Sequence, residues 1–120
     1  AALLDMELHN LTDTENLNVV AFEKETMDKL GLIPEIAPRY RATYFSHIIG
    51  GYAAGYYSYL WAEVLDTDAF EAFKEHGVFD KNTADSFRKN ILEKGGTEDP
   101  MTLYRGFRGA DPSLEPLLKK

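Results

Sequence analysis

The spacing of apolar residues constrains the fold of this 120-residue chain more than any other feature. Apolar side chains recur at helical intervals over most of its length, and alternation between apolar and polar residues is too limited to argue for a half-buried strand. Because a half-buried strand shows that alternation, the pattern predicts an all-α fold. The length is sufficient to bury a core, and it corresponds to one small domain or to a piece of a larger one.

Capping and stop signals divide the chain into five predicted helices. Residues 12–15 match a capping box, and Asp80 is a residue type favoured at the N-cap. Gly31, Gly77 and the glycine pair at 95–96 are typical of the position that follows the end of a helix. With these limits, the helices are expected at roughly residues 1–11, 15–30, 53–76, 81–94 and 99–108.

Composition excludes several classes of function. Thirteen Lys and Arg against 20 Asp and Glu give a net charge of -7, so phosphate backbones and anionic membrane surfaces would repel the chain, and we expect no nucleic-acid partner. The absence of cysteine excludes disulfides, thiolate zinc ligands and a cysteine nucleophile. Residues 42–62 are uncharged apart from one His and are long enough to cross a membrane, but their glycines, tyrosines and serines argue against a membrane partner.

A tyrosine-rich segment is the strongest candidate for a functional site. If a helix covers Tyr52 onward, a rotation of 100° per residue places Tyr56, Tyr59 and Glu63 within about 40° of Tyr52. Three phenols and a carboxylate would then share one face. A phenol can donate a hydrogen bond to a developing oxyanion without carrying a charge, and a row of phenols can also bind a peptide backbone or a carboxylate.

His47 joins this face only if the chain bends. Continued back as a helix, His47 would lie about 220° around the axis from Tyr52, whereas a bend at Gly50 and Gly51 would bring it to the tyrosines. Aromatic residues at this spacing are also typical of a packed core. However, Gly50, Gly51 and Gly55 would each cost roughly 1 kcal/mol inside a helix, which favours a ligand beside them over packing alone.

The run HIIGGYAAGYYSYLWAE at residues 47–63 resembles the thimet oligopeptidase family of zinc metallopeptidases, and it looks closest to the peptidyl-dipeptidase (dipeptidyl carboxypeptidase) branch. The likeness extends back to residues 38–41 and forward to residues 107–109, whereas the first 33 residues fit more loosely. The resemblance implies a largely helical catalytic domain that hydrolyses short peptides, releases C-terminal dipeptides in this branch, and is mainly cytoplasmic. It also implies a zinc ion, held by a His-Glu-x-x-His helix and a downstream Glu.

The resemblance also implies roles for individual residues. His47 and Tyr59 match catalytic positions that hydrogen-bond the substrate and stabilise the tetrahedral intermediate. Tyr52 and Tyr56 match substrate-binding tyrosines of a glycine-rich loop that here includes Gly50 and Gly51.

The zinc ligands of the family are missing, because no His-Glu-x-x-His occurs in the chain. The first five residues lack an initiator Met and the basic region of a signal peptide. We therefore expect residues 1–120 to be a C-terminal fragment of a larger catalytic domain, which packs against the upstream part of that domain and receives zinc only there. Alone, the fragment is predicted to be inactive and to bind no catalytic zinc. A non-catalytic helical module that binds peptides or proteins is the alternative, and a purely structural domain is a third reading.

Overall fold

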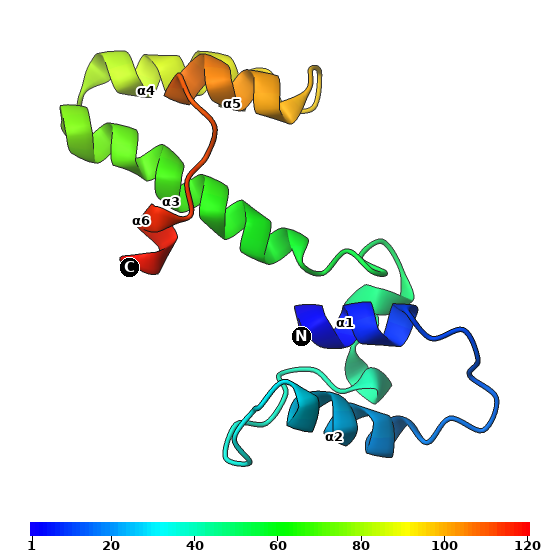
Figure 1. Cartoon of the computed structure of the whole chain (residues 1–120). Coiled ribbons are helices and arrows are strands. Elements are labelled where there is room, and N and C mark those ends of the chain that lie inside the picture. The colour runs from blue at the N-terminus through cyan, green and yellow to red at the C-terminus, as the bar shows by residue number, and fades with distance from the viewer. The chain divides into compact units, whose positions relative to one another are not determined.

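The computed structural model describes residues 1–120 and contains helices and turns but no strand, which confirms the all-α prediction (Figure 1). Two short 3₁₀ helices, Ala42–Tyr44 and Ser46–Ile49, and a π-helical turn at Arg88–Leu92 accompany the α-helices. None of the helices combines the length and apolar character that a membrane crossing requires. The α-helices are α1 (Ala2–His9), α2 (Val19–Lys29), α3 (Ser58–His76), α4 (Lys81–Phe87), α5 (Pro100–Arg108) and α6 (Glu115–Leu118).

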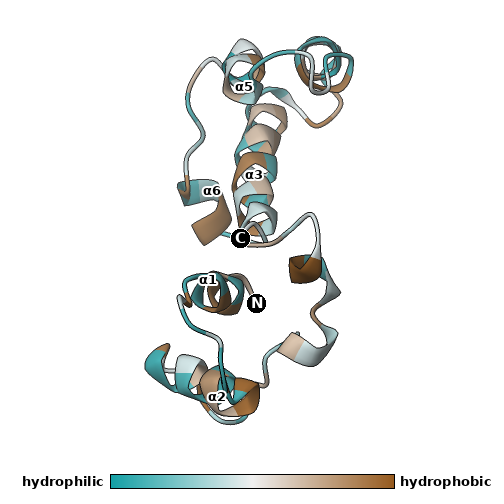
Figure 2. Cartoon of the chain, turned by 90° about the vertical axis from the view of Figure 1, so that its right-hand side faces the viewer, coloured by the Kyte–Doolittle hydropathy of each residue, from teal (hydrophilic) through white to brown (hydrophobic).

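The chain forms two compact units, the first at Ala1–Tyr59 and the second at Leu60–Lys120. The first contains α1, α2 and both 3₁₀ helices, and the second contains most of α3 together with α4, α5 and α6. Figure 2 shows that most of these helices carry both hydrophobic and hydrophilic residues, as expected for helices with one buried side.

Helix α2 begins four residues later than the capping-box pattern predicts. Asn16 has a φ of 61°, in the left-handed region, so a right-handed helix cannot run through it. The N-cap is Asn18, whose side-chain oxygen accepts a hydrogen bond from the Ala21 amide at 3.1 Å. In the predicted capping box, Asp13 instead accepts a hydrogen bond from the Glu15 amide, which closes a local turn.

Helix α3 begins at Ser58, five residues later than the pattern predicts. Residues 51–57 form consecutive turns, within which Ala54 has a φ of 52°. The amides of Ala54 and Tyr56 donate hydrogen bonds to the side chain of Asp5, not to carbonyls one helical turn back. The face that a helix from Tyr52 would have presented is therefore absent, and the tyrosines are brought together in another way.

Glycines and an aspartate mark the ends of α2 and α3 and the start of α4 as the sequence predicts, whereas α1 and α4 end earlier than predicted, at His9 and Phe87. Gly31 and Gly77 have φ values of 68° and 113° and follow the ends of α2 and α3. Asp80 caps α4 and Asp99 caps α5, each accepting a hydrogen bond from the amide three residues on. Those amide hydrogen bonds are the main reason why the pKa of each of the two carboxyl groups is lowered.

The core of the first unit combines apolar and charged side chains. Leu4 and Phe45 are almost fully buried, and Ile48 is buried as well. Glu23 of α2 is 3% exposed, accepts a hydrogen bond from the Ala42 amide and forms an ion pair with Arg41 at 2.7 Å. This buried carboxylate holds the start of the segment that leads into the tyrosine-rich turns against α2.

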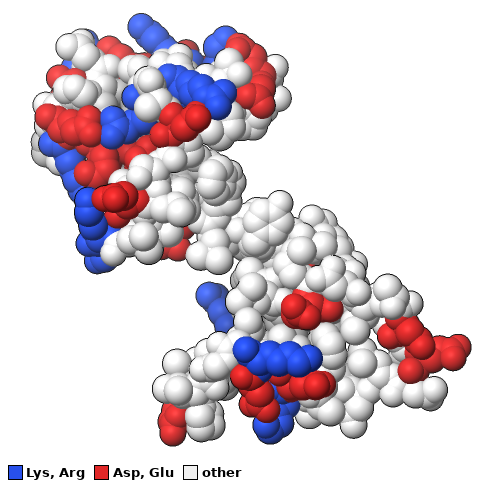
Figure 3. All heavy atoms as spheres, viewed as in Figure 1, with Lys and Arg blue, Asp and Glu red and all other residues white.

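The second unit is built around aromatic packing and a buried polar network. The rings of Phe73, Phe87 and Phe107 have centroids 5.1 to 6.2 Å apart, which joins α3, α4 and α5. The Tyr104 hydroxyl donates a hydrogen bond to the buried Asp68 carboxylate, and burial first and Asp68 second raise the pKa of that phenol. On the face drawn in Figure 3, acidic and basic side chains lie beside one another over this unit.

Candidate functional site

The predicted site residues of the first unit lie together in a cluster of six aromatic rings. His47 is at its centre, with ring centroids 5.2 Å from Tyr56, 5.8 Å from Tyr52 and 6.2 Å from Tyr59. All four predicted side chains thus occupy one site, although no helical face unites them. We call the set the aromatic cluster, and its members are Tyr40, Phe45, His47, Tyr52, Tyr56 and Tyr59.

The aromatic cluster runs from a buried floor to an exposed rim. Phe45 forms the floor with 1% of its surface exposed, and Tyr40 stacks on it at a centroid distance of 4.9 Å. Tyr56 is half-buried and packs edge-on against Phe45, with the two ring centroids 5.0 Å apart. Tyr52 and Tyr59 stack on each other at 5.3 Å and are 41% and 47% exposed. The two rim phenols are therefore more accessible to a dissolved molecule than the half-buried Tyr56.

The backbone folds back after the second 3₁₀ helix and thereby places His47 among the tyrosines. That helix ends at Gly50, and the Tyr52 amide donates a hydrogen bond to the His47 carbonyl at 3.2 Å. Neither Gly50 nor Gly51 has a positive φ, and a Cβ at either position would meet nothing within 4 Å. The bend occurs where it was predicted, but it does not use the left-handed freedom of glycine, and open space lies beside both residues.

Asp5 of α1 fixes the turns that carry the tyrosines. Its side chain is fully buried, and its two oxygens accept hydrogen bonds from the amides of Ala54 at 3.0 Å and Tyr56 at 2.9 Å. The Nδ1 atom of His9 lies 2.9 Å from the oxygen that Ala54 reaches. A buried carboxylate needs such partners, because an unpaired buried charge is strongly unfavourable.

Two phenols of the aromatic cluster have a raised pKa. Burial is the largest cause for Tyr56, followed by the neighbouring Tyr40. For Tyr59 the adjacent Tyr52 hydroxyl is the largest cause, followed by burial. Both shifts move ionisation further above neutral pH, so Tyr56 and Tyr59 keep the hydrogen that a donor needs.

His47 has one ring nitrogen inside the protein. Its Nδ1 atom is buried and has no hydrogen-bond partner. An unpaired buried N–H is costly, so the tautomer that leaves Nδ1 bare and carries its hydrogen on Nε2 is the one that suits this environment. In that tautomer Nε2 is a neutral hydrogen-bond donor.

Comparison with known proteins identifies the relationship. The model of peptidase family M3 matches residues 1–120, which is the whole chain. The chain belongs to peptidase family M3. Its curated relatives include proteins named oligopeptidase A and dipeptidyl carboxypeptidase.

Three of these relatives illustrate the similarity. Oligopeptidase A of Haemophilus influenzae is 44% identical over 119 residues, and dipeptidyl carboxypeptidase of Escherichia coli is 44% identical over 126 residues, covering 98% and 99% of this chain. Oligopeptidase A of Escherichia coli is 58% identical over 76 residues, or 62% of this chain and 11% of its own length. The chain spans 18% of the length of each of the first two and is 44% identical to both, so these identities do not separate oligopeptidase A from dipeptidyl carboxypeptidase.

The residues of this M3 chain do not fit a zinc site. No group of three or more His, Asp or Glu side chains lies close enough together to hold a metal ion. His9 and His76 each approach a carbonyl of their own helix, at 2.8 and 2.9 Å. The zinc ion that the family relationship implies would therefore need ligands from other parts of the polypeptide.

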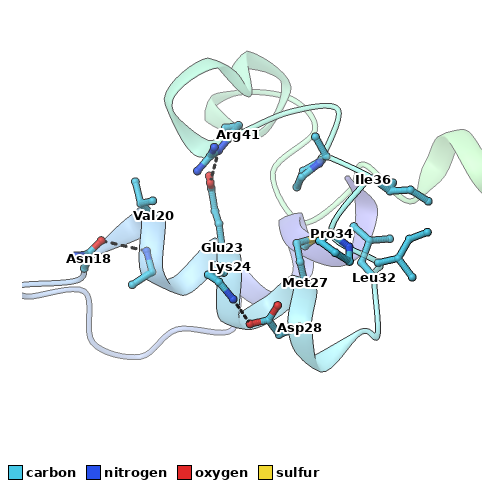
Figure 4. A pocket seen from close by; sticks show the side chains of 14 residues that line it. Asn18, Val20, Glu23, Lys24, Met27, Asp28, Leu32, Pro34, Ile36 and Arg41 are labelled. Carbon is cyan, nitrogen blue, oxygen red and sulfur yellow. Dashed lines mark hydrogen bonds and ion pairs between the residues drawn. The ribbon is translucent and has the colours of Figure 1, made fainter.

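A groove of this M3 chain lies beside α2 and contains none of the predicted site residues. Figure 4 shows this groove, which has a volume of about 610 Å³. The ion pairs Glu23–Arg41 and Lys24–Asp28 lie along it, at 2.7 and 2.6 Å. Its apolar lining comes from α2 and the following loop and includes Val20, Met27, Leu32, Pro34 and Ile36.

Sequence reasoning missed three residues of the site in this M3 chain. Tyr40 lies in the segment that carries the resemblance at residues 38–41, but nothing in the spacing linked it to His47. Phe45 is an ordinary core residue by type. Asp5 gave one signal, because it directly follows Leu4 in an apolar stretch where a carboxylate would be costly without a partner.

Proposed function

We propose that this chain is the substrate-binding side of the active site of a zinc-dependent M3 metallopeptidase that hydrolyses short peptides and releases C-terminal dipeptides. The observation that carries the proposal is the aromatic cluster, in which His47 lies within 6.2 Å of Tyr52, Tyr56 and Tyr59. Zinc and its ligands would belong to the upstream part of the same catalytic domain. The cytoplasm is the proposed location.

In this proposal His47 and Tyr59 are the catalytic donors. The carbonyl oxygen of the scissile peptide bond becomes anionic when the carbonyl carbon is attacked, and a donor placed where that charge develops stabilises the transition state more than the substrate. The exposed hydroxyl-bearing ring of Tyr59 and the Nε2 hydrogen of His47 can supply such hydrogen bonds. In the tautomer with its hydrogen on Nε2, His47 donates without a positive charge, as a phenol does.

Tyr52 and Tyr56 are proposed to position the peptide. Tyr52 is exposed at the rim beside Tyr59, and Tyr56 lies deeper against His47. Their hydroxyls can bind the peptide backbone or the free C-terminal carboxylate, which is the group that an enzyme releasing C-terminal dipeptides must recognise. The open space beside Gly50 and Gly51 leaves room for an extended peptide to approach their backbone.

The test uses the full-length protein and an N-terminally blocked pentapeptide, with the products separated by mass. We expect the C-terminal dipeptide as the first product, loss of hydrolysis with a metal chelator, and recovery with Zn²⁺. If the pentapeptide is instead cleaved internally, the proposed activity changes from the release of C-terminal dipeptides to that of an oligopeptidase. Complete absence of peptide hydrolysis would contradict the proposal.

The isolated 120-residue chain distinguishes the alternative function. We expect it to hydrolyse no peptide, because its residues do not fit a zinc site. If the full-length protein is also inactive and the isolated chain binds peptides saturably without zinc, the non-catalytic binding module becomes the better description. The exposed phenols of Tyr52 and Tyr59 would then form its binding surface.

Replacing Gly51 by Ala in the full-length protein should raise KM while changing kcat little. A Cβ at this position meets nothing within 4 Å in the chain itself, so the melting temperature should not fall. A bound peptide would meet the added methyl group. Because this contact weakens binding of the substrate and of the transition state equally, it raises KM and leaves kcat unchanged. Gly96→Ala is the matched control, because its Cβ also meets nothing and it lies outside the aromatic cluster. An unchanged KM for Gly51→Ala would mean that no peptide approaches this backbone closely.

A further inference from the structure

We propose that Asp5 is a positioning residue of the active site, which fixes the turn at residues 53–57 so that Tyr56 meets the substrate. The inference rests on the proposed function, because it concerns the same peptide-binding side. Asp5 is separated from this turn by about 50 residues of sequence, yet both of its oxygens bind backbone amides there. Both of these bonds go to backbone amides and neither goes to a side chain of the aromatic cluster, so Asp5 acts through the backbone.

The amides that Asp5 binds have no other acceptor. Within the turn, the amides of Ala53, Gly55 and Ser58 donate to carbonyls three residues earlier at 2.9 to 3.1 Å. Those of Ala54 and Tyr56 donate only to Asp5. The carboxylate thus supplies the two bonds that the local backbone cannot make, because amides in a non-helical turn lack partners of their own.

The turn contains a backbone conformation that needs external support. Ala54 has a φ of 52°, in a region that residues other than glycine adopt at a cost. Its amide is one of the two held by Asp5. Without the carboxylate, Ala54 could relax to a negative φ, and the direction of the chain at Tyr56 would change with it.

Tyr56 carries this constraint into the aromatic cluster. Its amide is bound by Asp5 at 2.9 Å, and its ring lies 5.2 Å from His47 and 4.8 Å from Tyr59. A shift of its backbone therefore moves the ring and, with it, the hydroxyl that is proposed to bind the peptide. His9 supports the arrangement from α1, with its Nδ1 atom 2.9 Å from Asp5 Oδ1.

Asp5→Asn in the full-length protein tests the inference. An amide group can accept through only one of its two ends, so one of the two backbone N–H groups faces an NH₂ group and loses its acceptor. We expect kcat/KM to fall by about tenfold or more. A buried N–H group that has lost its acceptor disfavours the turn conformation that positions Tyr56 by a factor of about that size. Glu7→Gln is the matched control, because it makes the same chemical change on an exposed face of α1 and should leave kcat/KM unchanged.

A double-mutant cycle with Tyr56→Phe separates positioning from general stability. If Asp5 acts by placing the Tyr56 hydroxyl, Asp5→Asn should lower kcat/KM by less than about threefold once that hydroxyl is absent. Fully multiplicative effects of the two substitutions would overturn the inference and leave the proposed function intact. If Tyr56→Phe alone changes nothing, the proposed role of Tyr56 fails and the inference fails with it.

Hydrogen exchange on the unmodified full-length protein covers the case in which Asp5→Asn does not fold. The amides of Ala54 and Tyr56 lie outside regular helix, so protection from exchange there would reflect their bonds to Asp5. We expect slow exchange at both amides. Exchange as fast as in a free peptide of the same sequence would show that the carboxylate does not hold the turn in solution and would overturn the inference.

Discussion

Tyr59→Phe in the full-length protein is expected to lower kcat and kcat/KM together by about 10²- to 10³-fold, which is the usual cost of removing one oxyanion donor. The substitution removes only the hydroxyl and keeps the ring that stacks on Tyr52 at 5.3 Å and packs against Tyr56 at 4.8 Å. Since the ring contacts remain and 47% of the side chain is exposed, the melting temperature should change little. A loss in kcat without a loss of stability identifies an interaction made in the transition state.

Tyr57→Phe is the matched control for this substitution. Tyr57 is 54% exposed, adjacent in sequence to Tyr56, and has no ring contact within the aromatic cluster. Its hydroxyl should therefore be dispensable. If Tyr59→Phe retains the parent kcat, or if both variants lose activity equally, Tyr59 has no specific part in the reaction.

The pH dependence of activity offers a second check on Tyr59. Its pKa is raised above the ordinary value of 10.0, first by the Tyr52 hydroxyl and then by burial. A phenol acts as a donor only while protonated, so any loss of activity caused by Tyr59 ionisation must occur above pH 10. Tyr52→Phe removes the largest cause of the shift and should move that loss to lower pH.

Local sequence signals predicted the helical class and several helix limits because they act within a few residues. Gly77 follows the end of α3 with a φ of 113°, and Asp80 caps α4 through the Thr83 amide. Such signals fail where a distant residue competes for the same backbone groups. The start of α3 is displaced from about residue 53 to Ser58 because Asp5 binds two amides in between.

The grouping of the site residues was predicted from a geometry that the structure does not contain. A helical wheel placed Tyr52, Tyr56 and Tyr59 on one face, whereas Tyr52 and Tyr56 lie in turns before α3 begins. They meet because the chain folds back at Gly50 and because the turn packs on Phe45. Of the residues that the wheel placed together, only Tyr59 and Glu63 share helix α3, where Glu63 forms an ion pair with Lys120 at 3.3 Å.

Substitution of His47 is expected to show which ring nitrogen matters. Asn places its amide near the position of imidazole Nδ1, whereas Gln reaches the position of Nε2 and can donate from it. Because the buried Nδ1 has no partner, the useful hydrogen belongs on Nε2. We expect His47→Asn to lower kcat/KM by about 10²-fold or more, the cost of one transition-state donor, and His47→Gln to retain a clearly larger share of activity.

The comparison between these two variants isolates the hydrogen bond from the loss of the ring. Both remove the imidazole that contacts Tyr52, Tyr56 and Tyr59, so both should lower the melting temperature by a similar amount. Their difference in kcat/KM then reports the donor at the Nε2 position. Equal activity in the two variants would assign His47 to packing within the aromatic cluster and leave Tyr59 as the single proposed donor to the oxyanion.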